Sequence, residues 1–154
     1  MLVADDNEFN LFTFKQILKN NYNLESDGAF DGSDAVKKFV KSLSCCPYRV
    51  VFMDVNMPVM DGLEATRKIR EIIKEHLNAP EYHEYKLNCE IKGKKFIPID
   101  DFPIVALTAN DTLLERQRCI DAGMQSFLSK PPDFIKLKQK LIEIFGKEFS
   151  TGFK

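Results

Sequence analysis

The sequence predicts an α/β fold in which a parallel sheet is covered by helices on both faces. Short apolar runs of strand length alternate with longer segments of helical period along the chain, which is the pattern of parallel sheets flanked by helices. The run from Val50 to Met53 contains no polar residue, as expected for a central strand covered on both faces. Hydrophobic residues make up 44% of the chain and charged residues 29%, so one soluble domain with a buried core is expected.

The first half of the chain contains three pairs of a strand and a helix. The predicted elements are strands at residues 1–4, 25–30 and 49–54 and helices at 8–20, 33–43 and 63–75. Asn7 is a suitable N-cap for the first helix because its side chain can accept a bond from an N–H group of the first turn. Asp31 and Gly32 indicate a turn before the second helix, and Pro58 and Gly62 indicate a loop before the third.

Apolar residues at helical spacing define the sides of the first two helices that we expect to be buried. In the first helix these residues are Phe9, Leu11, Phe12, Ile17 and Leu18. In the second helix they are Ala35, Val36, Phe39 and Val40. Both helices are therefore predicted to pack these side chains against the sheet.

The second half continues the alternation to five strands and five helices. The remaining predicted elements are strands at 104–107 and 126–128, a helix at 112–122, and a last helix capped by Asp133 that ends near Phe145 and Gly146. This count fits a flavodoxin-like, doubly wound five-stranded parallel sheet with strand order 2-1-3-4-5. Residues 77–101 interrupt the alternation, and we interpret them as an insertion, with a surface hairpin, in a single domain that spans residues 1–154.

Composition and charge exclude several classes of protein. Lys and Arg total 22 against 23 Asp and Glu, so no positive excess favours binding to nucleic acid or to an acidic membrane. No apolar run reaches the roughly 18 residues that a membrane span needs. Reduced thiols are expected, because no C-x-x-C pair occurs among Cys45, Cys46, Cys89 and Cys119. A cytoplasmic location is expected, because the start has no basic segment followed by an apolar one, as a secretion signal would. Only residues 1–4 precede the first acidic pair, which suggests a fragment of a longer polypeptide.

Polar residues that can take part in chemistry stand at the carboxyl ends of the predicted strands. Asp5 and Asp6 follow the first strand, Asp54 ends the third, Thr108 ends the fourth and Lys130 follows the fifth. Open α/β sheets bind their ligands at this edge. Three carboxylates meeting there would repel one another without a cation between them, and their hard oxygens suit Mg²⁺. A Mg²⁺ site is therefore predicted at the carboxyl edge of the sheet.

Asp54 is the best placed nucleophile of this group. A carboxylate beside a bound metal can attack phosphorus and form an acyl phosphate. The ammonium of Lys130 can neutralise one phosphoryl oxygen, and the hydroxyl of Thr108 can donate to another. Each residue alone has a purely structural explanation, since Asp6 and Thr108 could cap the helices that follow them. The occurrence of all five at strand ends, in order, favours the functional interpretation.

Four short motifs resemble the signatures of response regulator receiver domains. They are residues 3–7 (Val-Ala-Asp-Asp-Asn), 52–62 (Phe-Met-Asp-Val-Asn-Met-Pro-Val-Met-Asp-Gly), 107–109 (Leu-Thr-Ala) and 129–131 (Ser-Lys-Pro). The resemblance implies a two-component phosphorelay in which Asp54 takes a phosphoryl group from a histidine kinase or a histidine phosphotransfer protein, followed by autocatalytic hydrolysis. The chain looks most like receivers attached to hybrid histidine kinases, in which a phosphotransfer helix docks near the first helix and the loop after Lys130.

The resemblance also assigns roles to individual residues. It implies that Mg²⁺ is held by Asp5, Asp6, Asp54 and the backbone carbonyl of Asn56. Thr108 resembles the family's switch hydroxyl and Phe127 its rotating aromatic side chain, so phosphorylation is expected to shift a two-state equilibrium that controls partner binding. Lys130 resembles the family's site lysine, and a cis peptide bond is expected between it and Pro131.

Two other functions remain open on the residues alone. A phosphatase of the haloacid dehalogenase type also uses a strand-end aspartate, Mg²⁺ and a lysine, but it needs a second acid where this chain has Asn56. An unphosphorylated docking module is disfavoured because no site residue is missing. Zinc binding by His76, His83 and Cys89 is disfavoured because their spacing matches no standard ligand pattern.

Overall fold

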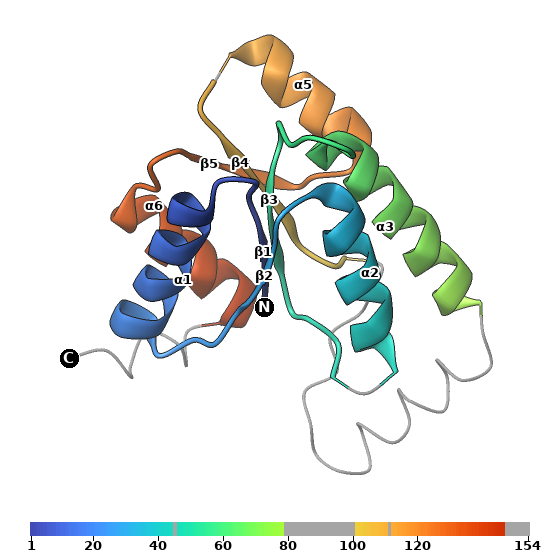
Figure 1. Ribbon diagram of the computed structural model, residues 1–154, viewed down its shortest axis with the longest axis horizontal. Helices are drawn as coiled ribbons and strands as arrows, with labels where there is room; N and C mark the ends of the chain where they lie inside the picture. The colour runs from blue at the N-terminus through green and yellow to red at the C-terminus, as the bar shows by residue number, and fades with distance from the viewer. Residues whose placement is uncertain (45, 79–100, 111, 147–154) are drawn as a thin grey trace.

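A five-stranded parallel sheet forms the centre of the protein (Figure 1). The computed structural model describes residues 1–44, 46–78, 101–110 and 112–146. The strands are β1 (Leu2–Ala4), β2 (Asp27–Ala29), β3 (Val51–Asp54), β4 (Ile104–Thr108) and β5 (Ser126–Ser129). All neighbouring strands pair in parallel in the order β2-β1-β3-β4-β5, which confirms the predicted fold class and strand order.

Each helix in the described ranges begins after a polar residue that caps its first turn. The helices are α1 (Glu8–Tyr22), α2 (Gly32–Leu43), α3 (Gly62–Leu77), α5 (Leu113–Ala122) and α6 (Phe134–Phe145). The side chains of Asn7, Asp31, Asp61, Thr112 and Asp133 accept hydrogen bonds from N–H groups of the first turn. The predicted caps Asn7 and Asp133 are therefore confirmed. None of these described helices is long and apolar enough to cross a lipid bilayer.

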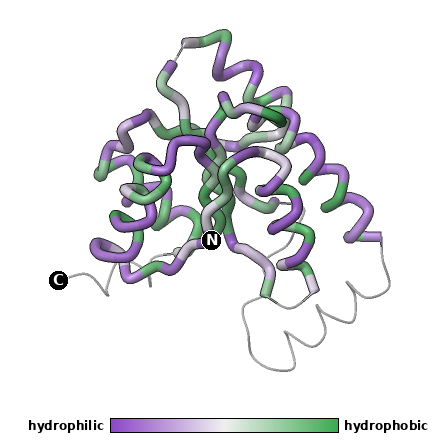
Figure 2. The backbone as a smooth tube through the Cα atoms, in the orientation of Figure 1, coloured by the Kyte–Doolittle hydropathy of each residue, from purple (hydrophilic) through white to green (hydrophobic). Residues whose placement is uncertain are grey.

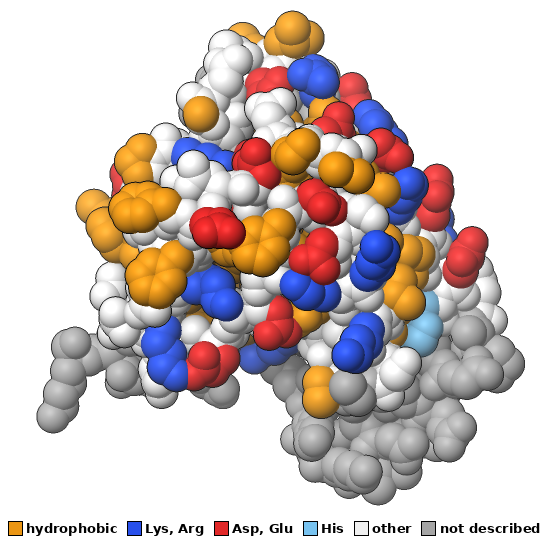
Figure 3. Space-filling model, in the orientation of Figure 1, with side chains coloured by type: hydrophobic (Ala, Val, Ile, Leu, Met, Phe, Trp, Pro, Cys, Tyr) orange, Lys and Arg blue, Asp and Glu red, His pale blue; other side chains and the backbone are white. Residues whose placement is uncertain are grey.

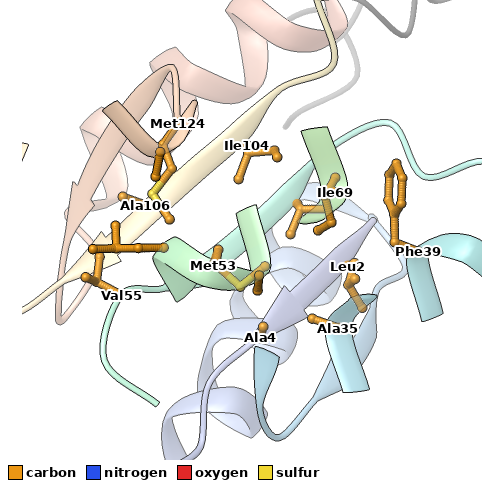
Figure 4. Packing of buried hydrophobic residues seen from close by; sticks show 14 of the residues in the cluster. Leu2, Ala4, Ala35, Phe39, Met53, Val55, Ile69, Ile104, Ala106 and Met124 are labelled. Carbon is orange, nitrogen blue, oxygen red and sulfur yellow. The ribbon is translucent and has the colours of Figure 1, made fainter. Parts of the chain in front are cut away.

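The sheet separates two hydrophobic cores because successive side chains of a strand point to opposite faces. In β3, Val51 and Met53 belong to the core beneath α2, α3 and α5, whereas Phe52 belongs to the core beneath α1 and α6. Figure 1 shows α1 and α6 on one face of the sheet and α2 and α3 on the other. The strands between them are mainly hydrophobic (Figure 2). Figure 4 shows side chains of α2 and α3, including Phe39 and Ile69, converging on the strands.

The predicted buried sides of α1 and α2 are wrong in part. The buried residues of α1 are Leu11, Phe14, Leu18 and Tyr22. These four recur at three- or four-residue intervals and share one side of the helix, whereas Phe9 and Phe12 fall outside that side and are 75% and 62% exposed. In α2, Ala35 and Phe39 are buried as predicted, but Val40 is 45% exposed.

Some element boundaries differ from the predicted ones by one or two residues, as is common at the ends of helices and strands. The strand β3 begins at Val51 rather than at residue 49, and Gly32 is the first residue of α2 rather than part of a turn. The helix α3 continues to Leu77. The hairpin predicted within residues 77–101 falls on residues 79–100, which lie outside the described part of the chain.

Candidate functional site

Three carboxylates meet at the carboxyl edge of the sheet. Asp5 follows β1 and Asp54 ends β3, and these two strands are adjacent, with Ala4 paired to Met53. One carboxylate oxygen each of Asp5, Asp6 and Asp54 lies within 4.8 Å of the other two. Asp5 and Asp54 are buried, and Asp6 is exposed. Because buried like charges at this separation repel one another, this acidic cluster requires positive charge nearby.

The ammonium of Lys130 lies between the two buried carboxylates. Its Nζ is 2.6 Å from Asp5 Oδ2 and 2.5 Å from Asp54 Oδ2. Lys130 directly follows β5, and its peptide bond to Pro131 is cis, as the resemblance implied. One lysine against three carboxylates leaves a negative charge that a divalent cation can neutralise.

The surroundings of Asp54 oppose its ionisation. Burial raises the pKa of Asp54 above its usual value, and the nearby Asp5 carboxylate acts in the same direction. Lys130 and the N–H of Asn56, which donates to Asp54 Oδ1 at 3.2 Å, act in the opposite direction. Additional positive charge at this site would therefore favour the carboxylate form that a nucleophile needs.

The loop after β3 packs directly against the backbone of Asp54. A Cβ atom at Gly62 would lie 2.0 Å from the Asp54 carbonyl oxygen, so glycine is required there. The N–H of Gly62 donates to the Val55 carbonyl at 2.9 Å and closes the loop. Val59 is exposed and has a φ of 67°, a region that β-branched residues rarely adopt. The loop thus combines a close approach at Gly62 with backbone strain at Val59.

The two predicted switch residues lie on β4 and β5. Thr108 is buried, and its hydroxyl accepts from the N–H of Asn110 at 3.0 Å and donates to the Asn110 carbonyl at 3.1 Å. Phe127 packs against the core beneath α2, α3 and α5, and the Arg116 guanidinium lies 5.6 Å from its ring centroid. The Thr108 hydroxyl is thus turned to the loop after β4. Its predicted action on a phosphoryl group at Asp54 requires a rotation and stays a prediction.

Asn10 contacts the acidic cluster and was not identified from the sequence. Its Nδ2 donates to Asp5 Oδ1 at 3.3 Å, and the N–H of Asn7 donates to the same oxygen at 3.0 Å. Asn10 stands three residues after the N-cap Asn7, a position from which a side chain can reach back across the start of a helix. That spacing is the sequence signal that could have found it.

An apolar surface borders the acidic cluster. A cavity of about 370 Å³ lies between α1 and the segment after β5, and both Asp5 and Lys130 line it together with Phe9 and Pro132. Phe9, which lines this cavity, is 75% exposed, and Figure 3 shows hydrophobic groups gathered over α1 and α6. The residues that define this α1–α6 surface are Phe9, Phe12, Phe134 and Ile135.

The acidic cluster is the one group of three or more potential metal ligands found among the described residues. Its donors are carboxylate oxygens, which suit Mg²⁺ better than softer metals. Of the residues considered for zinc, His76 lies on α3, whereas His83 and Cys89 lie outside the described ranges.

Comparison with known proteins identifies similar sequences. The family model of the response regulator receiver domain matches residues 1–79. The response regulator mcs4 of Schizosaccharomyces pombe is 32% identical over 147 residues, which cover 93% of this chain and 27% of mcs4. The hybrid signal transduction histidine kinase L of Dictyostelium discoideum is 33% identical over 147 residues, which cover 96% of this chain and 7% of the kinase. The chain thus spans only a small part of these relatives.

Solved structures give the same result for the fold. In the co-crystal structure of the Saccharomyces cerevisiae phosphotransfer protein Ypd1 with the receiver domain of Ssk1, the match has a TM-score of 0.71 and 25% identity and covers 93% of this chain and 86% of that chain. The receiver domain of the sensor histidine kinase PA1611 from Pseudomonas aeruginosa matches with a TM-score of 0.64 and 27% identity, covering 93% of both chains. The family match over residues 1–79, about half of the chain, shows that this chain belongs to the response regulator receiver domain family.

Proposed function

We propose that Asp54 accepts a phosphoryl group from the phosphohistidine of a histidine kinase or a histidine phosphotransfer protein. The observation that carries this proposal is the position of Lys130, whose ammonium contacts the carboxylates of both Asp5 and Asp54. A buried aspartate at a strand end, a lysine beside it and neighbouring carboxylates that can hold a divalent cation are the groups that phosphoryl transfer to a carboxylate requires.

In the proposed reaction an oxygen of Asp54 attacks the phosphorus atom of phosphohistidine. A new O–P bond forms while the N–P bond breaks, and the electron pair of that bond returns to the imidazole nitrogen. The Lys130 ammonium neutralises charge on one phosphoryl oxygen. The Thr108 hydroxyl donates to another after it leaves Asn110. Water later hydrolyses the acyl phosphate and restores the Asp54 carboxylate.

We infer that the acidic cluster holds Mg²⁺. Asp5, Asp6 and Asp54 offer oxygens close enough to share one ion, and Asn56 would add its backbone carbonyl. When bound, Mg²⁺ supplies positive charge that offsets the carboxylates and the transferring phosphoryl oxygens. The similar receiver domain of PA1611 has a magnesium ion coordinated in its active-site cleft, which supports this assignment.

We infer that the phosphodonor protein covers the α1–α6 surface. Phe9 lines the cavity beside Asp5 and Lys130, and Phe12, Phe134 and Ile135 expose further apolar area on α1 and α6. Exposed apolar clusters mark interaction sites. An amphipathic helix of a phosphotransfer protein could bury this area and bring its phosphohistidine to Asp54. The similar Ssk1 receiver crystallises together with the phosphotransfer protein Ypd1, which supports a partner of this kind. We also propose that the chain and this phosphodonor protein meet in the cytoplasm.

We also infer that phosphorylation alters the surface around α5. A Thr108 hydroxyl that turns to the phosphoryl group gives up both of its contacts with Asn110 in the loop before α5. Phe127 lies beneath the guanidinium of Arg116, which belongs to α5. A movement of these two side chains would therefore change the environment of α5 and its binding to partners.

Intact mass measurement after incubation with phosphoramidate tests the proposed reaction. We expect wild type to gain one phosphoryl group when Mg²⁺ is present, and we expect no gain with EDTA or in Asp54→Asn. Asp61→Asn is the matched control, because it lies in the same loop and asparagine can still cap α3. If neither wild type nor Asp61→Asn gains a phosphoryl group, the result would favour a docking module. Repeated turnover of a small phosphate ester would favour the phosphatase.

A further inference from the structure

A network of hydrogen bonds links the start of α1 to Asp5. The side-chain oxygen of Asn7 accepts from the N–H groups of Phe9 at 2.9 Å and Asn10 at 3.1 Å, which fixes the first turn of the helix. The N–H of Asn7 and the side-chain amide of Asn10 then both donate to Asp5 Oδ1. The cap therefore holds Asn10 where its amide reaches the end of β1.

The two carboxylate oxygens of Asp5 have different kinds of partner. Oδ1 accepts from two neutral donors at the start of α1, the cap residue Asn7 and Asn10, whereas Oδ2 faces the Lys130 ammonium within the acidic cluster. The Asp5 side chain is only 3% exposed, so solvent has little access to replace a lost donor. The Asn10 amide thereby helps to fix the plane of this carboxylate and to keep Oδ2 turned toward Lys130.

We propose that Asn10 is a positioning residue for the Mg²⁺ site, a role that rests on the function proposed above. Side chains that hydrogen-bond to a ligand carboxylate orient it and tune its affinity for the metal. Asn10 does this through Asp5. An amide is suited to the role because it donates to the carboxylate without adding a further charge to an acidic cluster that already repels itself.

The position of Asn10 distinguishes this role from a general contribution to folding. Asn10 is exposed apart from its contact with Asp5, and it lines the cavity next to the cluster. Asn20, on the same helix, is also exposed, and its amide donates to Gln16 Oε1 at 3.4 Å, away from the site. Replacing either asparagine by alanine favours the helical conformation slightly, which offsets part of the stability lost with its side-chain hydrogen bond.

Isothermal calorimetry with Mg²⁺, carried out on the whole chain, tests the proposal. Asn10→Ala is expected to weaken Mg²⁺ binding by about tenfold, the lower end of the range for residues that orient metal ligands. Its Tm without Mg²⁺ should fall by about 4 °C or less, because the higher helix propensity of alanine offsets part of the lost hydrogen bond to Asp5. Asn20→Ala should bind Mg²⁺ as wild type does. Asn10→Gln keeps an amide on a longer side chain and should recover part of the affinity.

The outcomes separate this inference from the proposed function. Equal Mg²⁺ affinity in wild type and Asn10→Ala overturns the positioning role and leaves the metal site intact. An equal loss in Asn20→Ala overturns it as well, because the effect would then belong to α1 as a whole. A wild-type protein that binds no Mg²⁺ overturns the metal site and the inference together. Asn10→Leu, which keeps the approximate shape without a donor, carries the same expectation if Asn10→Ala does not fold.

Discussion

The helix pair α1 and α6 and the helix pair α2 and α3 cover similar cores but have different outer surfaces. Both cores consist of tightly buried apolar side chains, one beneath α1 and α6 and the other beneath α2, α3 and α5. On the outside, the α1–α6 surface exposes large apolar groups, whereas α2 and α3 carry ion pairs such as Lys38–Asp34 at 2.7 Å and Lys68–Glu64 at 2.9 Å. The helix α5, on the same face as α2 and α3, exposes Leu113, Leu114 and Ile120. Figure 3 shows charged side chains of both signs interspersed over the α2 and α3 side.

This difference indicates that some apolar residues of α1 do not serve the hydrophobic core. The helix α1 has more apolar residues than one buried side can hold, so Phe9 and Phe12 lie outside the core. The outward side of α3 carries solvated charges instead. An exposed apolar area on the helix that begins at the proposed phosphoacceptor site is best explained by a partner that covers it during the reaction.

The largest expected effect contrasts buried and exposed aromatic residues within α1. Phe14 is buried, and its ring centroid lies 5.0 Å from that of Phe52, whereas Phe12 is mostly exposed. We expect Phe14→Ala to lower the free energy of unfolding by about 3–5 kcal/mol, since it leaves a cavity in the core. Phe12→Ala should change it by about 0.5 kcal/mol or less. Urea denaturation measures both changes in the free energy of unfolding. Similar values for the two variants would contradict the assignment of Phe14 to the buried side of α1 and of Phe12 to its exposed side.

A smaller effect is expected from adding a methyl group at two glycines. At Gly62 the new Cβ would meet the Asp54 carbonyl oxygen at 2.0 Å, and this rigid backbone has no room to move. At Gly28 it would meet the flexible side chain of Leu11 at 2.9 Å. We expect Gly62→Ala to cost about 3 kcal/mol and Gly28→Ala about 1 kcal/mol. Urea denaturation again provides the test, and the reverse order would show that the loop after β3 is less tightly packed than described.

A third prediction concerns partner contact rather than stability. The double change of Phe9→Ser with Phe12→Ser should slow phosphotransfer from a phosphorylated histidine phosphotransfer protein by about tenfold, because it removes apolar anchors from the α1–α6 surface. Labelling by phosphoramidate should stay at the wild-type rate. Val40→Ser is the matched control, since Val40 is an exposed apolar residue on the opposite face. An equal loss with both donors would place the defect in the site rather than in docking.

The smallest expected effect is a gain in stability. Val59 is exposed and adopts a positive φ, which costs a β-branched residue more than it costs glycine. Val59→Gly should therefore raise the free energy of unfolding by about 0.5–1 kcal/mol after the greater entropy of glycine in the unfolded chain is taken into account. Thermal denaturation checks the sign, and a lower Tm would mean that the Val59 side chain contributes contacts of its own.

Much of the fold was predictable because it depends on short-range patterns. The apolar run ending at Asp54 identified the central strand. The count of alternating strands and helices predicted a flavodoxin-like sheet, for which the observed order 2-1-3-4-5 is expected. The same pattern brought Asp5, Asp54 and Lys130 to one edge, since the carboxyl ends of parallel strands lie together. These inferences need only the direction of each strand and the position at which it ends.

Other features depended on three-dimensional detail that periodicity does not contain. The sequence pattern allows an apolar residue such as Phe9 on either the buried or the exposed side of α1. The choice depends on the orientation of the helix about its own axis relative to the sheet. The contact of Asn10 with Asp5 requires the exact start of α1, and the orientation of the Thr108 hydroxyl depends on a local turn with Asn110. Element boundaries and side-chain rotamers of this kind are the least certain outcomes of sequence patterns.

The most direct test of the phosphoacceptor is to locate the acyl phosphate in the chain. After labelling with phosphoramidate and Mg²⁺, borohydride reduces an aspartyl phosphate to homoserine, which peptide mass spectrometry can assign to one position. Asp54 as phosphoacceptor predicts homoserine at position 54 and no modification in Asp54→Asn. Homoserine at position 5, 6 or 61 of wild type would contradict the assignment of Asp54 as phosphoacceptor. The absence of homoserine from every position would contradict it as well.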